Sequence, residues 1–424
     1  MILRVEKSAL TGQVRIPASK SHTIRAVAIG SLASGKSRVS NPLVSADTLS
    51  AVNVYRKFGA DIVLNDEWII TGVGGKPGVP NDVLDVGNSG TSLYIAMGTA
   101  GLVKGYSVFT GDHQIRSRPA GPLLNSLRDL GADAFSTRGD DRPPLVIGGP
   151  MTGGRTVLDG SKTSQYLTSL LINCPLAENR TEIKVDNAIE LPYIEMTLSW
   201  LDGQGILYER EGFEHFSLPG GQGYHSFDKS IPGDFSSATF FLCAAAITGS
   251  ELVLLGLDMS DTQGDKAVVS MLQEMGARVQ QLPGGIYIKG MPLVGTDLDL
   301  SGTPDALPAL AVTACFAKGT TRLLNVPQAR LKETDRISVM CEELSKMGGK
   351  VTELPDGLVI EGSLLHSAKV RGHHDHRVVM ALAVAGLACD GITEVDTAEA
   401  VDVTFPNFVE LMQSVGARLE VTSS

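Results

Sequence analysis

The chain has 424 residues, of which 43% are hydrophobic and 20% charged, with a formal net charge of −11. This length exceeds what one hydrophobic core usually serves, so two domains are expected. The acidic balance argues against nucleic acid or an anionic membrane as the main partner, and the apolar runs are too short for a membrane span. The five cysteines occur singly and the first residues do not form a signal-peptide pattern, so we expect a cytoplasmic protein with reduced thiols.

Residues 1–5 read as a strand, and a short signature then recurs along the chain. It consists of the end of an amphipathic helix, a glycine with a small residue, and an alternating strand. Each glycine is placed where a left-handed residue ends a helix. Successive copies are roughly 70 residues apart, which predicts six strand-and-helix units, with two helices in each forming the buried centre of each domain. The six copies lie at residues 56–60, 127–132, 201–206, 272–277, 344–349 and 412–417.

The first polar cluster, residues 17–25, precedes an apolar helical run. Ser19 or Ser21 can cap this helix, and Arg25 lies about one turn beyond Ser21 on the same face. Lys20 would then lie beside the free amides of the helix, where an anion binds well. The alternative is an ordinary capped helix with solvated cations.

Three more clusters of this kind follow in the first half of the chain. The small residues of 85–92, including Asn88, Gly90 and Thr91, let backbone amides approach an anion, although such turns also occur for steric reasons. Residues 111–119 form the next cluster, in which Arg118 stands directly before Pro119. The planar guanidinium of an arginine can bind phosphate or carboxylate through two nitrogens. Residues 162–166 combine hydroxyl and amide groups before an apolar helix, where a plain helix cap is the alternative.

The second half repeats the pattern at residues 231–237, 303–306, 330–336 and 372–377. Residues 330–336 carry five charges, and a solvated helix start with Lys332 and Arg336 on one face is the simpler interpretation. Among the carboxylates of these clusters, Asp305 and Glu333 are the candidates for proton transfer.

Two segments resemble motifs that their surroundings do not support. Residues 30–37 match the P-loop pattern, but a helical run precedes them and an extended stretch follows, the reverse of a P-loop. Gly35 is instead expected to cap a helix. His373, His374 and His376 suggest zinc, but the adjacent Arg377 disfavours a metal.

The clusters share one property, a polar or cationic residue at the start of an apolar helix. If the repeats bring these helix starts to one cleft, an acidic protein gains a cationic pocket for a substrate with several negative charges. The cations concerned are Lys20, Arg25, Arg118, Lys332, Arg336 and Arg377.

These motifs, in this order and over essentially the whole chain, resemble the EPSP synthase (5-enolpyruvylshikimate-3-phosphate synthase) family of enolpyruvyl transferases. The most specific parts are Lys20-Ser21 with Arg25, residues 332–336 (KETDR) and residues 375–377 (DHR). The resemblance implies a two-domain α/β (α+β) fold of six βαβαββ repeats, three in each domain. It places residues 1–17 with 234–424 in one domain and 18–233 in the other, with the active site in the interdomain cleft.

The resemblance also implies the reaction. The enolpyruvyl group of phosphoenolpyruvate (PEP) moves to the 5-hydroxyl of shikimate 3-phosphate through a tetrahedral ketal, with release of phosphate, in the shikimate pathway to chorismate and aromatic amino acids. It implies no metal or organic cofactor and a monomer. Asp305, Glu333 and Lys20 would be catalytic; Lys20, Arg118 and Gln165 would bind the PEP phosphate, and Arg336 and Arg377 its carboxylate. Shikimate 3-phosphate would be held by Ser21, Arg25, Thr163, Ser164, Tyr193 and Asp305, and the remaining substrate contacts would be Asn88, Gly90, Thr91, Gln328 and Lys332.

Four positions depart from the family pattern. Tyr94 replaces a frequent Arg, Glu190 a phosphate-contacting Ser, Gln328 an Asn and Val403 a Lys. Since a carboxylate repels phosphate, Glu190 keeps open a related transferase with another hydroxyl acceptor. A non-catalytic anion-binding protein on the same scaffold would not need both acids. The UDP-N-acetylglucosamine enolpyruvyl transferases differ because they carry Lys-Asn at positions 20–21 and a loop cysteine that is missing before residue 174.

Overall fold

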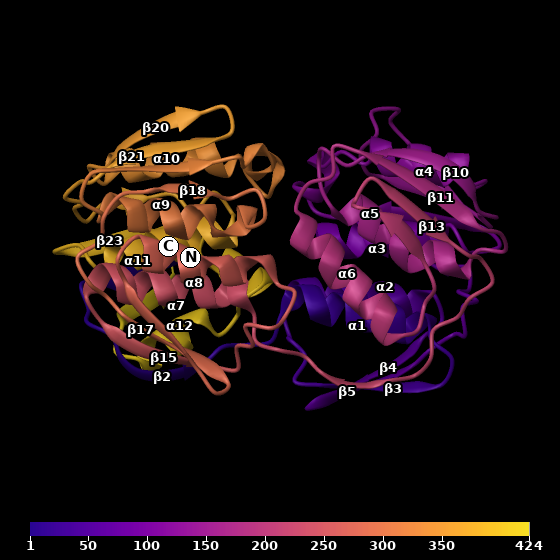
Figure 1. Ribbon diagram of the computed structural model, residues 1–424, viewed down its shortest axis with the longest axis horizontal. Helices are drawn as coiled ribbons and strands as arrows, with labels where there is room; N and C mark the ends of the chain where they lie inside the picture. The colour runs from indigo at the N-terminus through magenta and orange to yellow at the C-terminus, as the bar shows by residue number, and fades with distance from the viewer. Residues whose placement is uncertain (424) are drawn as a thin grey trace. The chain divides into compact units, whose positions relative to one another are not determined.

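The computed structural model describes residues 1–423 and divides them into two compact units (Figure 1). Unit 1 comprises Met1–Pro17 and Pro232–Ser424, and unit 2 comprises Ala18–Ile231. Each unit has a hydrophobic core of its own. Within residues 1–423, no helix is long and apolar enough to cross a membrane.

Each unit contains three four-stranded sheets with one pairing pattern. The sheets of unit 2 are β14 (Asp228–Ser230), β3 (Lys36–Ser40), β5 (Glu67–Thr71) and β4 (Asp61–Leu64); β6 (Leu84–Asp85), β7 (Tyr106–Thr110), β9 (Leu145–Gly148) and β8 (Asp133–Ser136); and β10 (Gly154–Asp159), β11 (Thr181–Asp186), β13 (His215–Leu218) and β12 (Glu209–Glu211). Those of unit 1 are β2 (Thr11–Arg15), β15 (Glu251–Leu255), β17 (Gly285–Lys289) and β16 (Arg278–Leu282); β18 (Asp297–Asp299), β19 (Thr320–Leu324), β21 (Gly357–Glu361) and β20 (Lys350–Leu354); and β22 (Lys369–Val370), β23 (Ile392–Val395), β1 (Ile2–Glu6) and β24 (Arg418–Thr422).

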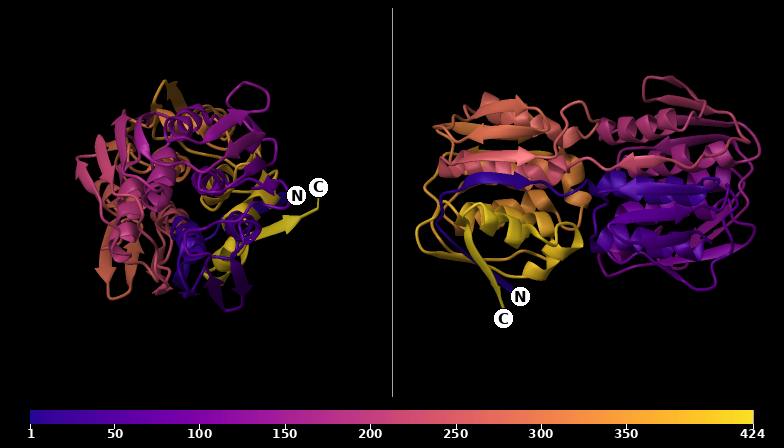
Figure 2. Two further views of the ribbon diagram at one scale, coloured as in Figure 1. Left: turned by 90° about the vertical axis from the view of Figure 1, so that its right-hand side faces the viewer. Right: turned by 90° about the horizontal axis from the view of Figure 1, so that it is seen from below.

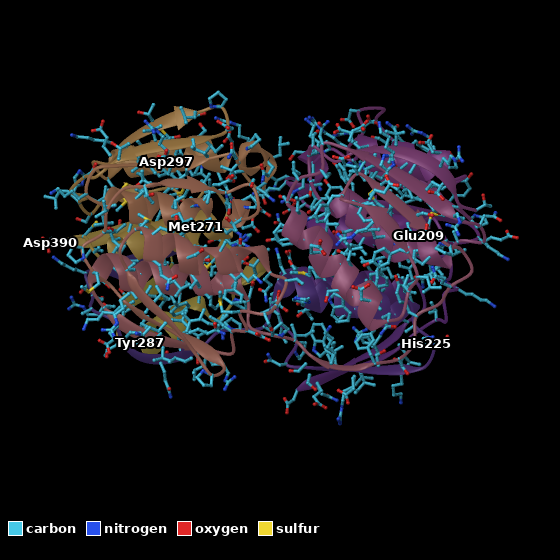
Figure 3. The ribbon with its side chains drawn as sticks, viewed as in Figure 1. Glu209, His225, Met271, Tyr287, Asp297 and Asp390 are labelled. Carbon is cyan, nitrogen blue, oxygen red and sulfur yellow. The ribbon has the colours of Figure 1, made fainter. Side chains whose placement is uncertain are left out.

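The pairing within each sheet is parallel, antiparallel and antiparallel in turn, as a βαβαββ repeat produces. Three repeats are completed by strands distant in sequence: β14 pairs with β3, β2 pairs with β15, and β1 lies between β23 and β24. The two ends of the chain therefore lie side by side in unit 1 (Figure 2). Figure 3 marks two of the unit 1 sheets with Tyr287 on β17 and Asp297 on β18. The predicted fold class of six such repeats, three in each unit, is confirmed.

The two helices of a repeat differ in burial, which corrects the expectation that both form the centre. The first helix of each repeat is buried on nearly all sides, and the second buries one face only. The buried helices are α1 (Lys20–Leu32), α3 (Gly90–Ala100) and α5 (Gln165–Asn173) in unit 2, and α7 (Phe235–Thr248), α9 (Leu307–Cys315) and α11 (His376–Gly386) in unit 1. The half-buried ones are α2 (Ala46–Lys57), α4 (Gly121–Asp129), α6 (Leu191–Gly203), α8 (Ala267–Glu274), α10 (Arg336–Lys346) and α12 (Phe408–Ser414).

The repeated glycine turn is confirmed at all six copies. Each glycine lies two residues beyond its helix with φ between +67° and +106°, a region that is cheap only for glycine. The next amide donates back to the carbonyl five residues earlier, as in Ala60 to Tyr55 and Ala417 to Met412. The same hydrogen-bonded turn thereby leads the chain out of each half-buried helix toward the next strand. The glycines are Gly59, Gly131, Gly205, Gly276, Gly348 and Gly416.

The buried helices begin at polar residues, and this positions the functional side chains. Ser19, Ser89, Asp234 and Asp375 cap α1, α3, α7 and α11 through their side chains. A 3₁₀ turn, Pro304–Ala306, leads into α9. An apolar helix core thus forces the polar residues to its amino end, where free amides favour negative groups.

Candidate functional site

In unit 2, Gly90, Thr91, Arg118 and Gln165 lie together at the amino ends of α3 and α5. The Nε2 of Gln165 donates to the Thr91 hydroxyl at 3.0 Å. A Cβ added to Gly90 would lie 2.6 Å from an Arg118 guanidinium nitrogen, so a larger residue would displace Arg118. The predicted grouping of a glycine, a hydroxyl, an amide and an arginine is therefore present in this unit. It offers a cation and amide donors to an anion.

Asn88, also predicted to contact substrate, is turned to a neighbouring loop. Its Nδ2 donates to Asp112 Oδ2 at 2.6 Å and to the side-chain oxygen of Gln114. These bonds hold residues 111–114 against the turn before α3, so Asn88 supports the turn in this structure.

Lys20, the first residue of α1, forms an ion pair that sequence analysis missed. Its Nζ lies 3.0 Å from Oδ2 of Asp47, which is buried in the first turn of α2. Asp47 is 27 positions away, and only the capping residues around it, Ser45 and Thr48, hint at a helix start there. The pair fixes the ammonium of Lys20 at the amino end of α1.

Arg25 is buried between α1, α5 and α6 with neutral partners. Its guanidinium donates to the hydroxyls of Thr197 (2.9 Å) and Thr168 (3.3 Å) and to the carbonyls of Tyr193 and Ser21, both at 3.1 Å. Burial lowers the pKa of Arg25 to about 10, so the group stays charged at neutral pH. A buried cation held by dipoles alone attracts an anion strongly.

Glu190 interacts with the two hydroxyl residues predicted to hold the acceptor. Its buried Oε2 accepts from the Ser164 amide (3.1 Å), the Ser164 hydroxyl (2.8 Å) and the Thr163 hydroxyl (3.4 Å). Glu190 adopts a left-handed backbone conformation, with φ of 53°, at the start of α6. The start of α5 therefore already has a carboxylate of the protein beside it.

In unit 1, Arg336 organises the predicted acids. Its Nη1 is 2.8 Å from Asp305 Oδ1, its Nη2 is 2.6 Å from Glu333 Oε2, and its Nε is 2.8 Å from Asp375 Oδ2. Burial alone would lower the pKa of Arg336, but the charges of Asp375, Glu333 and Asp305 together raise it above its usual value. Arg336 is thus a fixed positive charge that cannot act as an acid.

Asp305 is also in contact with the two other predicted cations of this unit. Arg377 Nη2 lies 3.1 Å from Asp305 Oδ2, and Lys332 Nζ lies 3.9 Å from Asp305 Oδ1. Gln328, four residues before Lys332, is buried, and its Nε2 donates to the Ser301 carbonyl at 3.3 Å. The expectation that Lys332 and Arg336 share a helix face is wrong, because Asp335 caps α10 through the Ser338 amide and the helix begins only at Arg336.

Two acids of unit 1 were not predicted as site residues. Asp375 caps α11 and binds Arg336 through both oxygens; its place before an apolar helix is the sequence signal that could have identified it. Asp265 is buried and accepts from the Ser236 hydroxyl. Burial and the negative charge of Asp305 raise the pKa of Asp265 to about 7, although Arg377 opposes the shift.

The two misleading motifs have structural explanations. α1 ends at Leu32 and β3 follows Gly35, so the chain runs from helix to strand, opposite to a P-loop. The helix is capped by Ala33, and Gly35 lies in the turn beyond it. Among residues 1–423, the one group with the spacing of metal ligands joins His373 to Glu342 and Glu343, without the other two histidines.

Comparison with known proteins gives matches over nearly the whole chain. A family model described as EPSP synthase (3-phosphoshikimate 1-carboxyvinyltransferase) matches residues 5–412. The chain is 56% identical to the 3-phosphoshikimate 1-carboxyvinyltransferase of Ruminiclostridium cellulolyticum, covering 99% of this chain and 100% of the relative. It is 57% identical to that of Acetivibrio thermocellus, covering 98% and 99%.

A solved structure supports the same assignment. The EPSP synthase from Acinetobacter baumannii superposes with a TM-score of 0.84 at 30% identity, and each chain is covered completely. The fold, the full-length relatives and the family match lead to one conclusion: this chain belongs to the EPSP synthase (3-phosphoshikimate 1-carboxyvinyltransferase) family.

Proposed function

We propose that this chain transfers the enolpyruvyl group of PEP to the 5-hydroxyl of shikimate 3-phosphate, with release of phosphate. The observation that carries the proposal is the placement of Asp305 and Glu333 on the two terminal nitrogens of one buried guanidinium, that of Arg336. Two acids held by a fixed cation suit a reaction that adds and then removes a proton at one carbon.

The proposed reaction has two steps. In the addition, C3 of PEP gains a proton while the 5-hydroxyl oxygen bonds to C2 and loses its proton, which gives the tetrahedral ketal. In the elimination, C3 loses a proton while the bond from C2 to the phosphate oxygen breaks and phosphate leaves. We assign the proton transfers to Asp305 and Glu333, with Lys20 as a third participant.

The binding roles divide between the units. In unit 2, Lys20, Arg118 and Gln165 take the PEP phosphate, while Ser21, Arg25, Thr163, Ser164 and Tyr193 take shikimate 3-phosphate. In unit 1, Arg336 and Arg377 take the PEP carboxylate. A carboxylate bound there draws part of the positive charge away from Asp305 and Glu333, which favours a proton on one of them. Binding of PEP thus prepares the acid that protonates C3.

A second candidate is an enolpyruvyl transfer to a different hydroxyl acceptor. It is favoured by the carboxylate of Glu190 at Thr163 and Ser164, because a phosphate at the same hydroxyls would meet a negative charge. We further propose a cytoplasmic monomer. All five cysteines are free, which suits a reducing compartment, and light scattering of the purified protein tests the oligomeric state.

The deciding experiment follows phosphate release by the purified protein with PEP and shikimate 3-phosphate. Release that requires both substrates supports the proposal. If PEP binds but shikimate 3-phosphate elicits no release, the acceptor assignment is wrong and other hydroxyl acids are the next substrates to assay.

A further inference from the structure

Glu343 is a buried carboxylate that the proposed reaction does not use. It lies on α10, seven residues after Arg336, so the two occupy the same buried face of one helix. Its side chain is fully buried. A buried carboxylate is costly unless its oxygens are bonded, so its partners show what it is there to hold.

The partners of Glu343 belong mainly to the segment before α11. Oε2 accepts from the Arg371 amide at 3.0 Å, and Oε1 lies 2.7 Å from Nε2 of His373. Lys346 Nζ also lies 2.8 Å from Oε1 and 2.7 Å from Oε1 of Glu342. The ammonium of Lys346 already supplies a cation to these carboxylates, which argues against a metal ion at the group of Glu342, Glu343 and His373.

The held segment is conformationally strained. His373 and His374 have φ of 54° and 56°, and a residue other than glycine pays an energetic cost in this region. Two further acceptors assist Glu343, since Asp396 accepts from the Gly372 amide (2.8 Å) and Thr397 from the His374 amide (3.1 Å). The strain persists because surrounding side chains fix the backbone.

This segment leads directly into site residues. Asp375 follows His374 and binds Arg336 through both carboxylate oxygens, and Arg377 binds Asp305. One helix, α10, therefore touches this stretch of chain at two levels: at its start through Arg336 and Asp375, and two turns later through Glu343, Arg371 and His373.

We propose that Glu343 is a positioning residue for the PEP carboxylate site: it holds residues 371–374 so that Asp375 meets Arg336 and Arg377 meets Asp305. The inference rests on the proposed function, in which Arg336 and Arg377 bind the PEP carboxylate. It assigns Glu343 no contact with substrate. Its loss would loosen Arg377 without removing any charge that touches PEP.

The test is Glu343→Gln, with Glu342→Gln as the matched control. Glu342 is the exposed neighbour that also bonds Lys346; its carboxylate lies near His373, but among the described residues it forms no hydrogen bond or ion pair with residues 371–374. We expect Glu343→Gln to raise KM for PEP about tenfold while KM for shikimate 3-phosphate changes less than about twofold. Glu342→Gln should leave both values near those of the wild type.

A purely structural role would lower the melting temperature without this difference between the two KM values. Wild-type KM for PEP in Glu343→Gln, or equal increases in both KM values, would overturn the inference. If Glu343→Gln does not fold, His373→Ala removes one contact at a partly exposed residue, and an unchanged KM for PEP in that variant rejects the inference equally. Failure of the proposed function is a separate result, because the wild type and Glu342→Gln would then release no phosphate.

Discussion

Two buried arginines, one in each unit, solve the problem of a buried positive charge in opposite ways. Arg25 is 2% exposed and is held by hydroxyls and carbonyls, whereas Arg336 is 1% exposed and is held by three carboxylates. The pKa of Arg25 is accordingly lowered and that of Arg336 raised. At equal burial, the partners alone decide the difference.

The different partners suit the two arginines to different roles toward a substrate. The surroundings of Arg25 leave a net positive charge, which an anionic substrate can neutralise. The surroundings of Arg336 are already balanced by acids, so a substrate carboxylate there must share the cation with Asp305 and Glu333. We infer that the first arrangement is built for binding and the second for coupling binding to proton transfer.

The largest expected effect comes from removing an acid at Arg336. Glu333→Gln keeps the shape of the side chain but cannot accept or donate the proton that the reaction needs. We expect kcat to fall about 10²- to 10⁴-fold, while equilibrium binding of shikimate 3-phosphate persists. Stopped-time phosphate assays and calorimetric titration measure the two quantities. A kcat near that of the wild type would show that Glu333 is not a proton-transfer residue.

The comparison itself is tested by the same substitution at both arginines. Arg336→Met leaves three carboxylates without their shared cation and should lower the free energy of unfolding by about 3–5 kcal/mol. Arg25→Met leaves only neutral groups and should cost less than about 2 kcal/mol, yet abolish acceptor binding. Denaturant unfolding of the two variants provides the values. If both variants lost the same free energy of unfolding, burial rather than the partners would determine how much each arginine contributes to stability.

Asp265 is a buried acid whose surroundings, like those of the two arginines, shift its pKa, and this makes the stability of the protein depend on pH. Its pKa is raised by burial and by Asp305 to about 7, so the folded protein holds this proton more tightly than the unfolded chain does. Its contribution to stability is therefore present at low pH and is lost as the pH rises from about 4 to 7.

The neutral variant Asp265→Asn should remove this loss. At pH 8 we expect it to stabilise the protein by up to about 4 kcal/mol relative to the wild type, and at pH 4 by almost nothing. Thermal unfolding between pH 4 and 8 follows the effect. The exposed residue Asp390, mutated to Asn, is the control, and a pH-independent difference for Asp265→Asn would reject the explanation.

The sequence predicted what depends on local patterns. Six helix ends were identified because a left-handed glycine and a helical period are both visible within a few residues. The starts of α1, α3, α5 and α11 could be predicted because polar residues precede an apolar run there, and these starts contain Lys20, Gly90, Gln165 and Arg377. The domain limits and the roles of these residues in catalysis remain predictions.

What the sequence could not show are the pairings across the fold. Lys20 with Asp47, Ser164 with Glu190 and Arg336 with Asp375 are separated by 27, 26 and 39 positions. The first two pairs join the two helices of one repeat and the third joins helices of neighbouring repeats, and local propensity carries no information on how these helices pack. The acids were therefore missed as partners, although their cations and hydroxyls were found.

Glu190 gives the smallest expected effect and extends the comparison to the acceptor site of unit 2. Its carboxylate places a negative charge at Thr163 and Ser164, which weakens attraction of a phosphate to the same hydroxyls. Glu190→Gln retains a carbonyl oxygen that can accept from the Ser164 amide but removes the charge. We therefore expect KM for shikimate 3-phosphate to fall about threefold, with kcat little changed. The matched control is Glu195→Gln on the same helix, an outward-facing residue paired with Arg210. A higher KM in Glu190→Gln would mean that the carboxylate assists binding, because it orients the two hydroxyls more than it repels the phosphate.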